Sequence, residues 1–205
     1  MMKIVLLDIN KEMTDAWHKY FDSEDVEIVN DTFEGYAGTH AVQCIVSPAN
    51  AYGLMDGGYD LAISNYYTAY YHLNIGQLVR LHIMEQYLGE QPVSSALMVP
   101  LKNAPWLLHC PTMRTPRQIK DPEVIYHCMR NTLLEANQWI GEDEIIVIPA
   151  FGGATGRVPC ADIARLMWKA YRQINNPPDK IDWNYAIENK FLLKDPIVLQ
   201  KPSIT

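Results

Sequence analysis

Apolar runs of strand length alternate along the chain with longer segments in which apolar residues recur at helical spacing. This alternation predicts an α/β fold in which helices cover most of the sheet. The run IIVI at 145–148 shows no polar alternation, which is typical of a central strand buried on both faces. The predicted strands span residues 2–8, 26–29, 42–47, 94–100, 105–110 and 144–149.

Capping residues mark the ends of several predicted helices. Asp121 and Pro122 precede a long helical segment and Gly141 follows it, as expected for an N-cap, a first helical residue and a stop. Another helix begins at Pro159, and the spacing of its apolar residues predicts a stripe that faces the core. The predicted helices span residues 11–22, 59–71, 75–88, 122–140, 159–174 and 182–190.

Length and composition favour a single domain over residues 1–205. The chain has 205 residues and is 48% hydrophobic, which suffices for one full-sized core. The N-terminal apolar run Ile4–Leu7 is too short for a signal peptide or a membrane span, so we expect no membrane association. Four cysteines without a C-x-x-C pair predict neither a zinc site nor disulfides and favour a reducing, cytoplasmic setting.

Two glycine-rich loops carry the candidate chemistry: 47–60 (SPANAYGLMDGGYD) and 149–159 (PAFGGATGRVP). The net charge of −7 provides no global positive field, so we expect no non-specific nucleic-acid binding. Each loop follows a predicted strand and precedes a helix, where free N–H groups bind phosphate without lysine. Neither matches G-x-G-x-x-G or the P-loop, so an ordinary turn with left-handed glycines is the alternative for each.

Three motifs together resemble the macro domain family. IVSPANAYGLMDGGYDLAI is similar to the family's strand, N-A-A-N element and glycine triplet, and PAFGGATGRVP is similar to its phosphate-binding loop PALGTGxxGxP. LLHCPTMRTP at 107–116 stands where the family often carries IIHTVGP. The resemblance covers about 25–174, leaves a C-terminal helix and tail at 175–205, and is nearest to stand-alone bacterial and bacteriophage proteins. It implies a three-layer α/β/α sandwich with a mixed sheet of about six strands, and ADP-ribose binding at the strand ends.

The resemblance also implies roles for three polar residues. Asp31 takes the place of the family's aspartate that contacts the adenine amino group; a turn-forming aspartate is the alternative. Asn50 matches the last asparagine of N-A-A-N, which contacts the distal ribose. Asp60 follows Asn50 at the separation found in hydrolase-type members, where the aspartate activates water. A first-turn aspartate that only stabilises its helix is the competing explanation for Asp60.

Further ligand contacts are implied by position in the motifs. Asp56 stands where the family usually has another glycine, and Arg157 pairs with a phosphate or lies on the surface. Arg114 has either a structural or a cleft role, and Trp183 and Tyr185 are candidates for stacking on adenine. The ligand-binding residues predicted in addition to Asp31 are Thr32, Ala49, Gly57, Gly58, Tyr59, Phe151, Gly152, Gly153, Ala154, Thr155, Gly156 and Arg157.

The function implied by the resemblance is binding of ADP-ribose, free or on another macromolecule, with hydrolysis at the distal anomeric carbon. Asn50 and Asp60 are the predicted catalytic residues. The alternatives are a reader module without catalysis and a phosphatase acting on ADP-ribose 1″-phosphate. We expect a monomer that needs neither a metal ion nor a cofactor.

Overall fold

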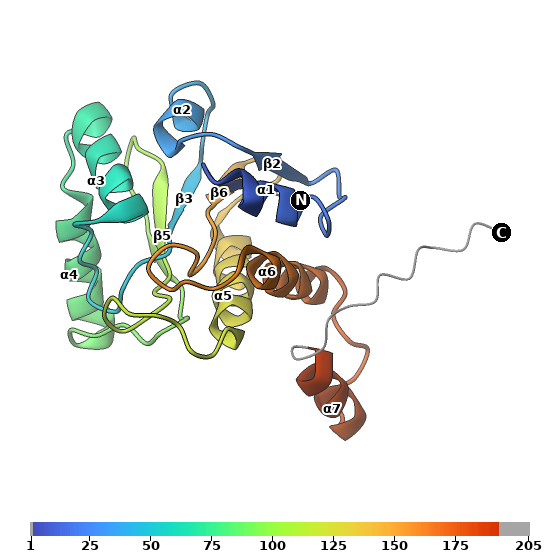
Figure 1. Ribbon diagram of the computed structural model, residues 1–205. Coiled ribbons are helices and arrows are strands. Elements are labelled where there is room, and N and C mark those ends of the chain that lie inside the picture. The colour runs from blue at the N-terminus through green and yellow to red at the C-terminus, as the bar shows by residue number, and fades with distance from the viewer. Residues whose placement is uncertain (1, 193–205) are drawn as a thin grey trace.

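One mixed sheet forms the centre of the molecule in the computed structural model, which describes residues 2–192. Its strands follow the order β2-β1-β6-β3-β5-β4 (Figure 1). Within the described residues, β4 pairs antiparallel with β5, and every other pairing is parallel. The strands are β1 (Lys3–Leu7), β2 (Val26–Val29), β3 (Cys44–Ser47), β4 (Leu97–Val99), β5 (Trp106–His109) and β6 (Ile145–Ile148). The prediction of a mixed, six-stranded sheet is confirmed.

Helices cover both faces of the sheet, which gives three layers (Figure 1). Helices α1, α5 and α6 pack on one face, and α2, α3 and α4 on the other. None of the helices in residues 2–192 has the length and apolar character needed to cross a membrane. The helices are α1 (Lys11–Trp17), α2 (Phe33–Ala37), α3 (Gly58–Tyr71), α4 (Ile75–Tyr87), α5 (Glu123–Trp139), α6 (Cys160–Asn175) and α7 (Trp183–Leu192).

Alternate residues of each central strand serve the two cores. In β1, Ile4 and Leu6 belong to the core under α1, α5 and α6, whereas Val5 and Leu7 belong to the core under α2, α3 and α4. Successive strand side chains point to opposite faces, so a strand covered on both sides is apolar at every position. This is why the central strands lack polar alternation.

One predicted helix is clearly shorter in the structure, and one short helix was not predicted; the other predicted helices agree with the structure to within one or two residues at each end. The helix predicted over 11–22 ends at Trp17, and residues 18–20 form turns. Helix α2, with only five residues, was not predicted because it is too short to show helical periodicity. Its N-cap is Thr32, whose hydroxyl accepts a hydrogen bond from the Gly35 N–H at 3.0 Å.

The parallel strands bring their carboxyl ends to one edge of the sheet. Along that edge the strands follow the order β2, β1, β6, β3 and β5. The loops that leave these ends include both glycine-rich loops and the segment around Asp31. In open α/β sheets this edge is where ligands bind, so the topology brings the predicted site segments together.

Candidate functional site

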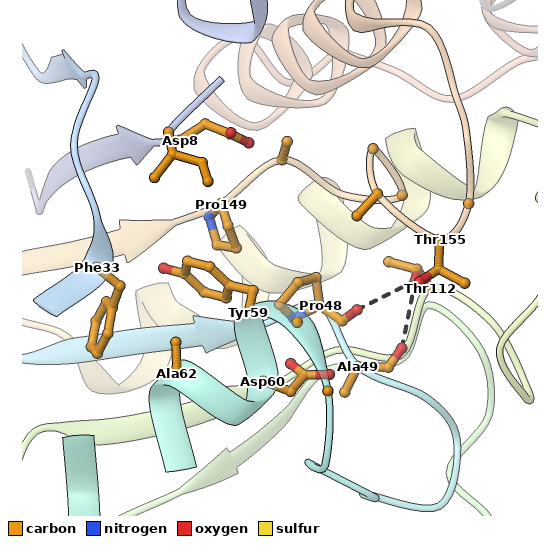
Figure 2. Close-up of a pocket in the computed structure, with 18 of the residues that line it drawn as sticks. Asp8, Phe33, Pro48, Ala49, Tyr59, Asp60, Ala62, Thr112, Pro149 and Thr155 are labelled. Carbon is orange, nitrogen blue, oxygen red and sulfur yellow. Dashed lines mark hydrogen bonds between the residues drawn. The ribbon is translucent and has the colours of Figure 1, made fainter. Parts of the chain in front are cut away.

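A cavity of about 710 Å³ opens at the carboxyl edge of the sheet. Its lining residues come from five segments: 7–13, 31–34, 48–62, 112–116 and 149–160. Figure 2 shows side chains from these segments facing a common space above the ends of the strands. The two glycine-rich loops form opposite walls of this cleft.

Asn50 lines the cleft and also holds its own loop in place. Its side-chain amide donates to the Leu54 carbonyl at 2.8 Å. Its amide oxygen accepts from the N–H groups of Tyr52 and Leu54, at 3.1 and 3.3 Å. The NH₂ group has two hydrogens, so one donor of Asn50 is left for a ligand.

Asp60 lies in the first turn of α3 and is held by a buried serine. The Ser47 hydroxyl donates to Asp60 Oδ1 at 2.7 Å, and Ser47 is fully buried. The N-cap of α3 is Gly57, which has no side chain, and among the described residues the Asp60 carboxylate accepts no main-chain hydrogen bond that would cap the helix. Burial raises the pKa of the Asp60 carboxyl from its ordinary 3.8 to about 6; the Ser47 hydrogen bond opposes this rise and the charge of Asp56 adds to it.

Gly57 and Gly58 leave the wall above Asp60 open. A Cβ atom built on either glycine would meet nothing within 4 Å. Gly58 also has a φ of +56°, a conformation that side-chain-bearing residues rarely adopt. Ala49 also lines the cleft, and Asp56 lines it from an exposed position. A ligand can therefore approach the main chain of this loop closely.

The second glycine-rich loop presents a row of free amides. Among the described residues, no main-chain N–H from Gly152 to Gly156 donates a hydrogen bond to the protein. A Cβ on Gly152 would lie 2.7 Å from the Ile119 side chain, and one on Gly156 would lie 2.5 Å from the Gly152 carbonyl oxygen. These two glycines fix the shape of the loop. The residues of the loop that line the cleft are Gly152, Gly153, Ala154, Thr155 and Gly156.

Asp31 and Thr32 lie at the opposite end of the cleft, beside the first turn of α2. The Thr32 N–H donates to Asp31 Oδ1 at 2.7 Å. A Cβ on Gly35 would lie 2.7 Å from the same oxygen, so glycine at 35 makes room for the carboxylate. Both residues are exposed and line the cavity, with Asp31 accessible to a ligand.

The two aromatic residues predicted in the loops lie in different places. Tyr59 lines the cleft, and its ring meets Phe33 edge-on with centroids 5.8 Å apart (Figure 2). Its hydroxyl is buried without a hydrogen-bond partner in the described part of the chain. Phe151, predicted as a ligand-binding residue, is fully buried in the core and does not line the cleft, so its ring is not in a position to contact a ligand there.

Several other candidates lie outside the cleft lining. Arg157 is exposed and does not line the cleft. Arg114 forms two hydrogen bonds with the Glu90 carboxylate, at 2.5 and 2.9 Å, which supports the structural role. Trp183 and Tyr185 lie on α7 and do not line the cavity. Trp183 is 83% exposed, and the Tyr185 hydroxyl accepts a hydrogen bond from the Gln173 side chain.

Several lining residues were not predicted, and the polar ones among them are Asp8, Asn10, Glu34, Thr112 and Cys160. Asp8 directly follows β1, and its Oδ1 accepts from the Asn10 N–H at 2.8 Å. Thr112 follows β5, and its hydroxyl lies 3.4 Å from the Pro48 carbonyl oxygen (Figure 2). Ligands bind at the carboxyl ends of the strands in open α/β sheets, so the end of the predicted strand 2–8 at Asp8 was a signal that could have identified this residue.

The charged residues of the lining are all acidic. They are Asp8, Asp31, Glu34, Asp56 and Asp60, and the lining contains no lysine, arginine or histidine. An anion in the cleft would therefore rely on main-chain N–H groups and on the N-terminus of α3 for its stabilisation.

Comparisons with known proteins bear on the family and on the fold. A family model described as Macro domain matches residues 46–167. The macrodomain of Mycobacterium tuberculosis DarG is 16% identical, with 66% of this chain and 85% of that chain covered and a TM-score of 0.53. A point mutant of the Oceanobacillus iheyensis macrodomain, solved with ADPR, is 15% identical, with 95% and 94% covered and a TM-score of 0.54. At these identities the solved structures show the fold alone, and the search of curated proteins gave no match.

Proposed function

Because the chain belongs to the macro domain family, we propose that its cleft binds ADP-ribose and that the protein hydrolyses ADP-ribosyl linkages at the distal ribose. The observation that carries the binding proposal is the row of free N–H groups from Gly152 to Gly156, opposite the open glycine pair of the first loop. Such amides stabilise a diphosphate where no cationic side chain does. A related macrodomain of Oceanobacillus iheyensis was solved with ADPR, which supports this ligand class.

The order of the strand ends suggests how the ligand lies. Asp31 follows β2 at one end of the edge, the amide row follows β6 in the middle, and Asn50 follows β3 beyond it. In the proposed orientation the adenine contacts Asp31, the diphosphate lies between the two glycine-rich loops, and the distal ribose contacts Asn50. The parts of ADP-ribose follow one another in the same linear order.

Asp60 is the proposed general base. Its carboxylate accepts a proton from a water molecule, the water oxygen bonds to the distal anomeric carbon, and the bond from that carbon to the acceptor atom breaks. The acceptor atom leaves with the electron pair and takes a proton from solvent. Positive charge that develops on the sugar is stabilised by the diphosphate and by the Asp60 and Asp56 carboxylates.

A reader module without catalysis is the second candidate, and one observation favours it. Both polar residues predicted to be catalytic already bond to the protein: Asn50 to its own loop, and one oxygen of Asp60 to Ser47. A phosphatase for ADP-ribose 1″-phosphate is less favoured, because Asp56 would repel a second phosphate at the distal ribose.

Calorimetric titration with ADP-ribose and turnover of a glutamate-linked ADP-ribosyl protein test the proposal together. We expect the wild type to bind and to turn over, and Asp60→Ala to bind but to lose turnover. Asp162→Ala is the matched control, because Asp162 lies in the first turn of α6 and outside the cleft lining. Wild-type binding without turnover identifies a reader, and no binding to the wild type refutes the ligand assignment.

A further inference from the structure

Asp8 is a cleft residue supplied by a part of the chain that precedes the matched family segment. It follows β1, whereas the family model matches residues 46–167. Because β1 lies between β2 and β6, Asp8 lies between Asp31 and the amide row along the edge of the sheet. Figure 2 shows its carboxylate at the rim of the cavity, across from Tyr59 and Pro149.

The Asp8 carboxylate is only partly satisfied by the protein. One oxygen accepts from the Asn10 N–H at 2.8 Å, and the described residues provide no ion pair for the other. The ionisable groups near it are Tyr59 and Cys160, whose pKa values its charge raises, so neither offers a compensating positive charge. A partly buried carboxylate in this state is stabilised by hydrogen-bond donors from a ligand.

We propose that Asp8 accepts hydrogen bonds from the 2′- and 3′-hydroxyls of the adenosine ribose and makes the cleft select for an unmodified ribose at that position. The inference rests on the proposed function, because it uses the orientation with adenine at Asp31 and the diphosphate at Gly152–Gly156. In that orientation the adenosine ribose lies between these two contacts, which is where Asp8 lies. Adjacent hydroxyls present two donors to a carboxylate, which has acceptor capacity on both oxygens.

Two changes to the ligand are rejected for different physical reasons. Without the 2′-hydroxyl, the Asp8 carboxylate loses a hydrogen-bond donor while the ligand still shields it from water. Sites that hydrogen bond to a ligand hydroxyl discriminate strongly against analogues that lack this hydroxyl. A 2′-phosphate places negative charge against Asp8, and the lining offers no cation to offset it. Removing the Asp8 carboxylate therefore abolishes the first penalty and reduces the second, because the other acidic residues of the lining still repel a phosphate.

The test is calorimetric titration of the full chain with ADP-ribose, its adenosine-side 2′-deoxy analogue and its adenosine-side 2′-phosphate. We expect the wild type to bind the deoxy analogue about tenfold more weakly than ADP-ribose, and the 2′-phosphate at least as weakly. In Asp8→Ala the deoxy analogue binds within about twofold of ADP-ribose, and the discrimination against the 2′-phosphate is smaller than in the wild type. Asp15→Ala, with an exposed carboxylate paired to Lys11 outside the lining, is the matched control and keeps the wild-type discrimination.

Asp8→Asn guards against a folding defect in the alanine variant. It retains an oxygen that accepts the Asn10 N–H but has no charge, so its discrimination against the 2′-phosphate falls while its thermal unfolding midpoint does not drop below that of the wild type. Equal binding of all three ligands by the wild type overturns the role of Asp8 and leaves the proposed function intact. Discrimination that persists undiminished in Asp8→Ala and Asp8→Asn also overturns it. Failure of the wild type to bind ADP-ribose is a different result, which refutes the proposed function.

Discussion

Asp60→Asn is expected to stabilise the folded protein at neutral pH although it removes a proposed catalytic group. The carboxylate is partly buried, and burial raises its pKa from 3.8 to about 6 despite the hydrogen bond from Ser47. An asparagine of the same shape keeps an oxygen that accepts from Ser47 and has no charge to desolvate. The substitution therefore removes the cause of the raised pKa and preserves the contact.

The magnitude follows from the pKa change. A rise of about 2 in the pKa of Asp60 on folding means that the ionised carboxylate lowers the free energy of unfolding by about 3 kcal/mol. The pKa of Asp60 is higher in the folded state than in the unfolded state. This destabilisation of the folded wild type is therefore small below about pH 4, grows as pH rises towards 6 and is constant above that. A first-turn aspartate also gains about 0.3–1 kcal/mol from the helix dipole, which the variant loses. We expect a net stabilisation of about 2 kcal/mol at pH 8.

Urea unfolding of wild type and Asp60→Asn at several pH values between 4 and 8 measures this difference. Asp162→Asn, in the first turn of α6, reports the effect of removing a first-turn aspartate outside the cleft. The reasoning fails if Asp60→Asn is no more stable than wild type at pH 8, or if its advantage does not grow between pH 4 and 6. Because the measurement needs no ligand, it tests the electrostatics of the site separately from its function.

The remaining predictions concern single contacts of the cleft. Ser47→Ala removes a donor to the Asp60 carboxylate, so the pH at which turnover rises moves up from about 6, as a pH–rate profile will show. Gly156→Ala places a Cβ 2.5 Å from a carbonyl oxygen of its own loop and costs about 1–3 kcal/mol in urea unfolding. Asp31→Asn weakens ADP-ribose binding in calorimetry by about 1–3 kcal/mol if its charge contacts adenine. Arg114→Met leaves that affinity within about twofold of wild type, because its ion pair lies outside the lining.

Periodicity identified the sheet because its strands are buried on both faces. The IIVI run of β6 and the stripe on α6, including Ile163 and Met167, satisfied packing rules that depend on local sequence alone. Helix α2 was not predicted, because its five residues do not complete two turns and show no helical periodicity. Its position depends on tertiary contacts such as the Phe33 and Tyr66 rings, whose centroids are 5.0 Å apart.

The motifs located the cleft walls but did not determine which side chains face the ligand. Within one loop, Gly152 lines the cleft whereas the neighbouring Phe151 is buried in the core. That division depends on backbone angles, such as the φ of +73° at Gly152, which a loop sequence does not specify. Asp8 was missed because a lone aspartate after a strand carries no motif. The end of the predicted strand 2–8 marked it as a strand-end residue, but its place between Asp31 and the amide row follows from the position of β1 between β2 and β6.

The cleft combines two parts of the chain that serve different parts of the proposed ligand. The glycine-rich loops, Asn50 and Asp60 lie inside the segment that matches the family model, and they face the diphosphate and the distal ribose in the proposed orientation. Asp8 and Asp31 lie before that segment, on the strand ends where the adenosine half would bind. Asp8 and Asp60 have different hydrogen-bond partners in the protein, Asn10 and Ser47, and face different parts of the proposed ligand, so we expect their effects on binding to be close to additive. Changes at Asp8 should therefore alter nucleoside selectivity without altering turnover of bound substrate, and changes at Asp60 should do the reverse.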